Sequence, residues 1–192
     1  MNKLIKVNRD AWAHGQVTSK LWLCRKLENH YFDHNPVLWV LGGWYGQLSF
    51  LLLTRERMPI EHIRSFDIDE EATINANIVN NNYEIDSWKF RAYTQDVNTL
   101  DYSGDQYSSR TPDIVINTSC EHMESNDWWD LIPDNTLVAL QSNNLEHDDA
   151  ILVHSLNEMK KKYPLTEITF EGKEEFVYPD KSFTRYMIIG MK

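Results

Sequence analysis

The sequence predicts an α/β fold built around a parallel sheet, because short apolar runs alternate with helical stretches along the chain. The chain has 192 residues, of which 42% are hydrophobic and 25% are charged, as is typical of a globular protein. A chain of this length buries about 70% of its unfolded surface on folding. We therefore expect one domain that needs no disulfide or metal to fold.

The first half of the chain contains the clearest strand and helix signals. The run over 37–41 is apolar throughout, which is typical of a strand buried on both faces of a sheet. Asn8 is a plausible cap for the first helix, and Asn35-Pro36 separates that helix from the strand. The elements expected here are helices over 8–30, 47–57 and 70–80 and strands over 37–41 and 62–68.

The second half of the chain continues the alternation of strands and helices but ends in two successive strands. The expected elements are strands over 88–92, 112–117 and 136–141 and helices over 126–131 and 148–161. Two strands then follow with no helix between them, over 166–170 and 184–191, and Gly172 and Pro179 bound the segment that connects them. Because no helix separates these two strands, they can pair antiparallel.

Charge and cysteine content exclude several classes of protein. With 19 Lys and Arg against 29 Asp and Glu, the net charge is −10, which opposes tight binding of a phosphate backbone. No apolar run approaches the ~20 residues of a membrane span, and the first residues lack the apolar segment of a signal peptide. We expect a cytoplasmic protein in which Cys24 and Cys120 are free thiols.

A glycine-rich turn follows the first predicted strand, at Gly42-Gly-Trp-Tyr-Gly46. A glycine there lets the backbone approach a ligand, and the following helix presents free N–H groups. The turn is neither a Walker loop nor a G-x-G-x-x-G motif, so a purely structural turn is the alternative. Asp67 ends the next strand, where a carboxylate can bind ribose hydroxyls. The alternative is a helix cap, a role that Asp69 fits better.

Taken in order, these segments resemble a class I S-adenosylmethionine-dependent methyltransferase. Segments 37–49, 65–69, 94–97, 112–123 and 131–140 resemble the family's motifs I to IV and the strand that follows them. The resemblance implies a Rossmann-like three-layer sandwich with a mostly parallel seven-stranded sheet and a C-terminal antiparallel pair. It also implies a single domain over 1–192, with an N-terminal helical cap over 1–34 and the core over 35–192.

The resemblance assigns the cofactor site residue by residue. The cofactor-binding residues it implies are Gly42, Gly43, Tyr45, Gly46, Asp67, Ile68, Asp96, Val97, Asn117 and Ser119. Two positions depart from the family pattern. Val40 stands where motif I usually has an acidic residue, and Trp44 replaces the middle glycine. Another residue must then contact the methionine ammonium.

The polar segment after the fourth predicted strand is the candidate catalytic region. His122 is a candidate base near neutral pH, with Glu121 beside it, unless the two simply begin a surface loop. Cys120 is expected to be a small buried residue rather than a nucleophile. His14, Gln16 and Lys20 on the N-terminal helix are candidate substrate contacts, and a helix that only packs is the alternative.

Metal-dependent methylation is a further alternative. Asn117, Asn143, Asn144 and the acidic segment over 146–149 are near the strand ends that it would use. Acidic residues in that segment also suit the first turn of a helix. We expect no metal.

The favoured function is methyl transfer from S-adenosylmethionine to a small molecule or protein, with S-adenosylhomocysteine as product. One alternative is an RNA or tRNA methyltransferase that uses a local basic face. Another is a binding protein that keeps the cofactor but has lost catalysis. A third is a nucleotide-binding oxidoreductase that binds NAD, although the final strand pair argues against it. The sequence indicates neither the acceptor nor the oligomeric state.

Overall fold

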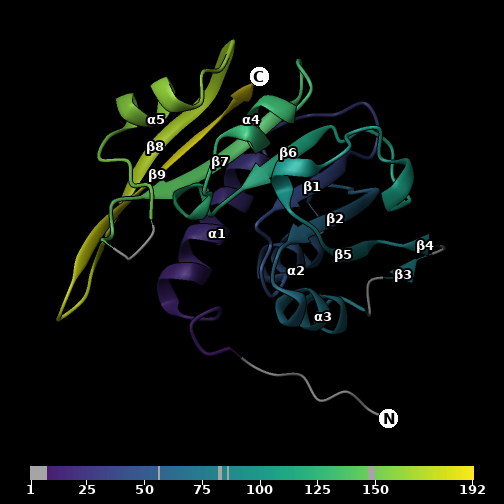
Figure 1. Ribbon diagram of the computed structural model, residues 1–192, viewed down its shortest axis with the longest axis horizontal. Coiled ribbons are helices and arrows are strands. Elements are labelled where there is room, and N and C mark those ends of the chain that lie inside the picture. Colours follow the sequence, from purple (N-terminus) through teal and green to yellow (C-terminus); the bar gives the residue numbers. More distant parts are fainter. Residues whose placement is uncertain (1–7, 56, 82–83, 86, 147–149) are drawn as a thin grey trace.

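A mixed sheet of seven strands forms the centre of the computed structural model, which describes residues 8–55, 57–81, 84–85, 87–146 and 150–192 (Figure 1). The strands are β1 (Val37–Leu41), β2 (His62–Asp67), β5 (Phe90–Thr94), β6 (Ile114–Asn117), β7 (Leu137–Asn143), β8 (Glu167–Val177) and β9 (Ser182–Met191). Their spatial order is β5-β2-β1-β6-β7-β9-β8, with the first five parallel and β9 antiparallel to both neighbours. The predicted sheet is confirmed. Two further strands, β3 (Glu84–Ile85) and β4 (Ser87–Trp88), pair separately.

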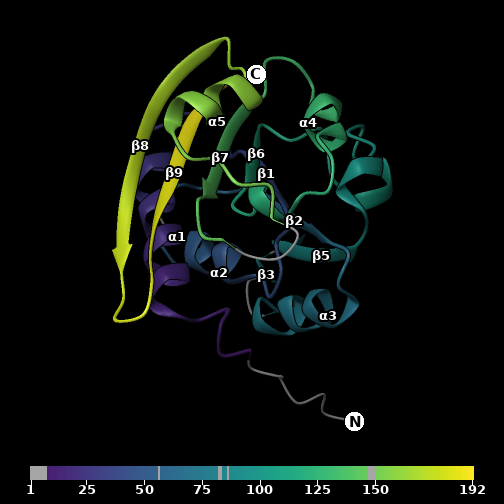
Figure 2. The same ribbon diagram turned by 60° about the vertical axis from the view of Figure 1, so that its left-hand side comes forward.

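Helices cover both faces of the sheet and complete the three predicted layers (Figures 1 and 2). They are α1 (His14–Leu27), α2 (Gln47–Thr54), α3 (Glu70–Val79), α4 (Asp127–Leu131) and α5 (Leu156–Lys162), with the 3-10 turns η1 (Val97–Thr99), η2 (Asp105–Tyr107) and η3 (Cys120–His122). The first three helices pack on one face, and α4 and α5 pack on the other. None of the described helices is long and apolar enough to cross a membrane.

Strand β1 shows why an apolar run predicts a central strand. All five of its residues are buried. Trp39 packs in the core beneath α4 and α5, whereas Leu38 and Val40 pack beneath α1 and α2. Because successive side chains alternate between the faces, a strand that is apolar throughout must be covered on both. Each large side chain buried in this way contributes about 1.5–3 kcal/mol.

Two helices begin later than the sequence predicts. α1 begins at His14, because Asn8 Oδ1 accepts a hydrogen bond from the backbone N–H of Asp10 at 2.9 Å and so closes a turn instead of capping a helix. α5 begins at Leu156, where the Ser155 side chain accepts from the N–H of Glu158 at 3.1 Å. The predicted start of this helix, at 148–149, lies outside the described residues.

The strands near the two edges of the sheet also differ from the prediction. The strand expected over 88–92 is Phe90–Thr94, and Trp88 belongs to β4. β8 runs through Gly172, which the sequence predicted as a boundary. A Cβ at Gly172 would lie 2.8 Å from Phe170 Cζ and 3.1 Å from Trp22 Cζ2. Glycine therefore marks the place where Trp22 of α1 packs closely on the strand.

Candidate functional site

A cavity of about 510 Å³ opens at the carboxyl ends of β1, β2 and β6. Within the sheet β1 lies between β2 and β6, so the strand order changes direction there. Ligands of open α/β sheets bind at this switch point. The sequence-predicted residues that line the cavity are Gln16, Lys20, Gly42, Gly43, Tyr45, Asp67, Ile68, Asp96, Val97, Ser119, Glu121 and His122.

The glycine loop between β1 and α2 forms one wall of the cavity. Gly42, Trp44 and Gly46 have positive φ values of 63°, 47° and 70°. A Cβ at Gly43 would lie 1.9 Å from Ser65 Oγ of β2, so only glycine lets the loop sit this close to the strand. The predicted strand-to-helix turn therefore places its backbone at the cavity.

Asp67, at the end of β2, is bonded to this loop. Its Oδ2 accepts a hydrogen bond from the backbone N–H of Trp44 at 2.8 Å, and its Oδ1 accepts from the N–H of Asp69 at 3.0 Å. Burial raises the pKa of Asp67, while these N–H groups act in the opposite direction. A carboxylate has about four acceptor sites, so Asp67 can hold the loop and still accept from a ligand.

Asp69 takes the helix-cap role that the sequence predicted. Its side chain accepts a hydrogen bond from the N–H of Ala72 at 3.1 Å, in the first turn of α3. The cap prediction is confirmed, and it leaves the Asp67 carboxylate beside the cavity.

Two further predicted contacts lie along the same side of the cavity. Ile68 is 73% exposed although it is apolar. Asp96 is also exposed, and its Oδ1 accepts from the backbone N–H and the Nδ2 of Asn98 at 2.9 and 3.0 Å. These bonds fix the Asp96 side chain at the start of η1, beside the buried Val97.

Two of the predicted cofactor residues lie behind the cavity wall. Gly46 packs α2 on α3, since a Cβ there would lie 2.9 Å from Ala76 Cβ. Asn117 is fully buried, and its Oδ1 accepts from the N–H of Ser119 at 2.8 Å. Both residues therefore shape loops that line the cavity without lining it themselves.

Three charged side chains are buried together at the part of the cavity near β6, β7 and β9. Lys20, Glu121 and Arg185 are 9%, 3% and 5% exposed. Arg185 Nη1 lies 3.9 Å from Glu121 Oε1 and donates to the Thr118 carbonyl at 3.2 Å. Asn143 Nδ2 donates to the same Glu121 oxygen. Lys20, Glu121 and Arg185 form the buried charge cluster.

Lys20 is the least compensated member of the buried charge cluster. Its Nζ donates to Gln16 Oε1 at 2.5 Å. Burial, followed by the nearby charge of Arg185, lowers the pKa of Lys20 to about 7. At neutral pH the ammonium is therefore partly deprotonated and is sensitive to any anion that enters the cavity.

The two predicted histidines differ in position. His122 lies at the cavity with its side chain 50% exposed, and its Nε2 is 3.9 Å from Glu121 Oε1. His14 lies outside this cavity and lines a separate hollow with Phe176 and Tyr178. The structure therefore does not bring His14 together with Gln16 and Lys20, because α1 presents it to the end of the β8–β9 hairpin.

Sequence reasoning missed two lining residues with buried polar groups. Gln47, the first residue of α2, is 3% exposed, and neither its Oε1 nor its Nε2 has a hydrogen-bond partner among the described residues. Its place directly after the glycine loop was a signal that could have found it. Arg185 is the other, and nothing near it in the sequence marks it. The remaining lining residues are Asp10, Ala11, Trp44, Asn98, Thr118, Met123 and Glu124.

Cys120 is buried next to the cavity residues but does not line the cavity. Cys24 and Cys120 are both free, and burial raises the pKa of both thiols. The predicted buried thiol therefore replaces the nucleophile alternative. Within the described part of the chain, no group of three or more His, Cys, Asp or Glu side chains is placed to hold a metal ion, and residues 147–149 lie outside that part.

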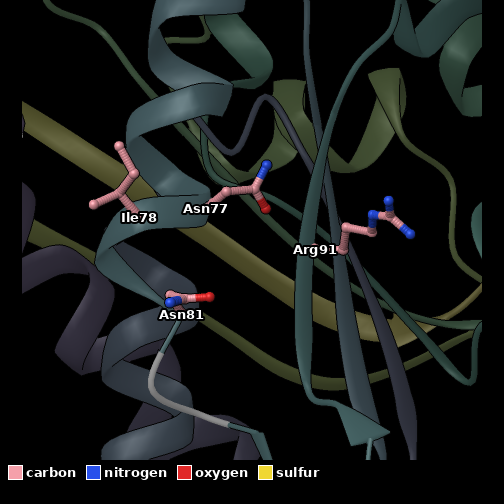
Figure 3. Close-up of a pocket in the computed structure, with 4 residues that line it drawn as sticks. All are labelled: Asn77, Ile78, Asn81 and Arg91. Carbon is pink, nitrogen blue, oxygen red and sulfur yellow. The ribbon is translucent and has the colours of Figure 1, made fainter. Parts of the chain in front are cut away.

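A second hollow between α3 and β5 has a different character (Figure 3). It is lined by Asn77, Ile78, Asn81 and Arg91. The Asn77 amide is already used, since it donates to the Ala92 carbonyl at 3.0 Å and accepts from its N–H at 2.8 Å. Arg91 points away from the helix. These side chains do not converge on a ligand position.

Comparisons with known proteins agree with the fold. No protein-family model and no curated protein matches the sequence. Among solved structures, the chain is similar to magnesium protoporphyrin IX methyltransferase from Synechocystis PCC 6803 with bound SAH, with a TM-score of 0.67 and 13% identity over 96% of this chain and 89% of that one. The chain has the methyltransferase fold.

Two further structures extend this likeness. The N-methyltransferase NodS from Bradyrhizobium japonicum WM9, in complex with S-adenosyl-L-homocysteine, has a TM-score of 0.67 and 9% identity over 96% of this chain and 93% of that one. Geranyl diphosphate methyltransferase, in complex with GPP and sinefungin, has a TM-score of 0.65 and 10% identity over 92% of this chain and 77% of that one. Because the identities are low, these likenesses establish the fold alone. The activity has to be inferred from the residues that line the cavity.

Proposed function

We propose that the protein is an S-adenosylmethionine-dependent methyltransferase with a small-molecule acceptor. The observation that carries this proposal is that one cavity is lined by residues of all four motifs predicted from the sequence. Gly43 follows β1, Asp67 ends β2, Asp96 follows β5 and Ser119 follows β6. The four segments line this cavity in the order, and at the strand ends, that the methyltransferase motifs imply.

The residues at the glycine loop fit the methionine part of the cofactor. The absence of a Cβ at Gly43 lets the loop backbone lie close to β2, where Ser65 Oγ lies 1.9 Å from the position that a Cβ would take. The Gln47 amide lines the cavity, is buried and has no partner among the described residues. Its oxygen can accept from the methionine ammonium and its nitrogen can donate to the carboxylate. Gln47 would thereby replace the acidic side chain that Val40 does not supply.

The residues along β2 and η1 fit the adenosine part. We assign the remaining acceptor sites of the Asp67 carboxylate to the ribose hydroxyls and the Asp96 carboxylate to the adenine amino group. The exposed apolar side chain of Ile68 also lines the cavity and provides a surface for the base. Covering Ile68 would remove apolar area from water, which stabilises the complex by about 25 cal/mol per Å².

Methyl transfer from S-adenosylmethionine requires little acid–base catalysis by the protein. When bound, the cofactor supplies a methyl group that its positive sulfur already activates. The protein must hold the acceptor in line with that bond and, where the acceptor loses a proton, take it up. Glu121 lines the cavity, and its Oε2 has no partner among the described residues. We assign Glu121 as the proton acceptor, and the half-exposed His122 as its route to solvent.

The other candidate functions have less support. A net charge of −10 opposes an RNA acceptor. The antiparallel strand β9 between β7 and β8 is the arrangement predicted for a methyltransferase and argues against an NAD-dependent enzyme. A binding protein without catalysis is distinguished only by assay.

The test is a label-transfer experiment. The protein is incubated with methyl-labelled S-adenosylmethionine and a cell extract separated into low-molecular-weight, protein and RNA fractions, with Glu121→Gln as the inactive control. We expect label in the low-molecular-weight fraction only. Label in protein or RNA would contradict the proposed acceptor class. Cofactor binding with no transfer to any fraction would support the binding protein instead.

A further inference from the structure

The buried charge cluster holds more positive than negative charge. Lys20 and Arg185 supply two cations, and Glu121 supplies one buried carboxylate. Glu121 Oε1 is already approached by Arg185 and by Asn143. Buried charges are costly unless they are paired, so a protonated Lys20 leaves one buried positive charge without a buried counter-ion. In a protein whose net charge is −10, this surplus is local and specific.

The two cations also keep hydrogen-bond donors unused. Arg185 Nη1 donates to Thr118, but the buried Nε of Arg185 has no partner among the described residues. The Lys20 ammonium has three donors, and one of them is used in the hydrogen bond to Gln16 Oε1. Both side chains line the cavity. A bound anion would satisfy these donors and supply the missing negative charge.

The backbone of Arg185 and the glycine loop belong to different parts of the sheet. Arg185 pairs with Asn143 across β9 and β7, whereas the glycine loop follows β1. The backbones of β1 and β9 are three strand spacings apart, which is about 14 Å, and Arg185 Nη1 reaches as far as the Thr118 carbonyl, which follows β6. The methionine carboxylate has its donors at the glycine loop and Gln47. With the methionine carboxylate assigned to those donors, the free donors of Lys20 and Arg185 are left for a second ligand.

Resting on the proposed function, we propose that the methyl acceptor carries a carboxylate, which binds between Lys20 and Arg185. The paired donors of the Arg185 guanidinium suit a carboxylate, and the Lys20 ammonium adds a point charge. Glu121, beside this anchor, is then placed near the acceptor group that receives the methyl. The acceptor class is a small organic acid or amino acid.

Binding of this carboxylate should be linked to proton uptake. The titratable groups that face Lys20 are Arg185 of β9, Glu121 of η3, and Asp10 and the Cys24 thiol from its own segment. Without a ligand the pKa of Lys20 is lowered to about 7. An adjacent carboxylate favours the ammonium and raises this pKa again. Carboxylate affinity should therefore be higher at about pH 6 than at about pH 9, and binding near pH 8 should take up a proton.

The test uses benzoate as the carboxylate probe, benzamide as its neutral counterpart and inorganic phosphate as a second anion. Each is titrated calorimetrically into protein with and without S-adenosylhomocysteine, in two buffers of different ionisation enthalpy. Lys20→Met and Arg185→Gln should each weaken benzoate at least about tenfold, and Arg185→Lys should recover part of the loss. Lys161→Met and Arg91→Gln, which remove exposed charges elsewhere, should not.

Two outcomes would overturn the proposal. The first is that benzoate shows no carboxylate-specific binding. It would then not bind at all, bind no more tightly than benzamide, or bind only in those variants and conditions in which inorganic phosphate also binds. The second is that Lys20→Met and Arg185→Gln weaken S-adenosylhomocysteine but not methylthioadenosine, which lacks the amino-acid carboxylate. The cluster would then serve the cofactor. Failure of the proposed function would look different, because S-adenosylhomocysteine would not bind while benzoate still bound and still depended on both cations.

Discussion

The backbone N–H of Trp44 donates to Asp67 Oδ2 at 2.8 Å, although 23 positions separate the two residues. Trp44 has a φ of 47°, a left-handed conformation that costs a residue with a Cβ about 1–2 kcal/mol. A hydrogen bond to a partly buried carboxylate offsets a cost of this size. The contact explains how the loop keeps its shape without the middle glycine, and it couples the loop to the acidic end of β2.

Replacing Asp67 by Ala should weaken S-adenosylhomocysteine binding by about 1–3 kcal/mol, because the variant loses both the ribose contact and the anchor of the loop. Calorimetric titration measures this directly. Asp69→Ala is the matched control, since its side chain caps α3. It should lower the free energy of unfolding by about 1 kcal/mol and leave cofactor affinity unchanged. Equal affinity for S-adenosylhomocysteine in both variants would contradict the assignment of Asp67 as a cofactor-binding residue.

A methyl group at Gly43 should displace the loop. In Gly43→Ala the new Cβ would meet Ser65 Oγ at 1.9 Å, an overlap that costs about 1–3 kcal/mol and moves the backbone away from the ligand. Adding Ser65→Ala removes that oxygen and leaves Ser65 Cβ as the nearest atom of that residue, at 3.2 Å. The double variant should therefore recover part of the lost stability and cofactor affinity. If it recovers neither, the close approach of loop and strand is not what fixes the site.

Loss of the proton acceptor should affect turnover rather than cofactor binding. Glu121→Gln should lower kcat by about 10²–10⁴-fold, the usual contribution of a general base. His122→Ala should have a smaller effect, because solvent can replace a route for protons. Both are measured as label transfer to the low-molecular-weight fraction, alongside the affinity for S-adenosylhomocysteine. A variant that loses affinity and turnover together would point to a structural role.

Stability should depend on pH through Lys20. The pKa of Lys20 is lowered to about 7 in the folded protein from its ordinary value of 10.5. Between these values the unfolded chain binds more protons, so the free energy of unfolding rises with pH across that window, by at most about 1.4 kcal/mol per unit. Denaturant titrations at several pH values should show this rise in the native sequence and not in Lys20→Met. Parallel curves would contradict the burial of a titrating Lys20.

The parts of the fold that sequence reasoning predicted are those fixed by local patterns. The apolar run of β1 indicated a strand covered on both faces, and the acidic start of α3 indicated the Asp69 cap. The start of α1 was missed because the Asn8 side chain closes a turn that competes with helix capping. With that start moved, the face of α1 that carries His14 could not be placed from the sequence.

The buried charge cluster could be predicted only in part. Lys20 and Glu121 were candidates because each lies in a segment that the methyltransferase resemblance places near the cleft. Arg185 lies near the other end of the chain, and its place beside them depends on β9 pairing with β7 in a particular register. Such convergence arises from tertiary structure, and no local pattern records it.

The central claim, that this cavity is a cofactor site, is tested most directly by one titration. S-adenosylmethionine, S-adenosylhomocysteine and, as control, NAD are titrated into the purified protein by calorimetry. The account predicts micromolar binding of the first two, none of NAD, and a loss of affinity in Asp67→Ala. Binding of NAD, or no binding of either sulfur nucleoside, would contradict it.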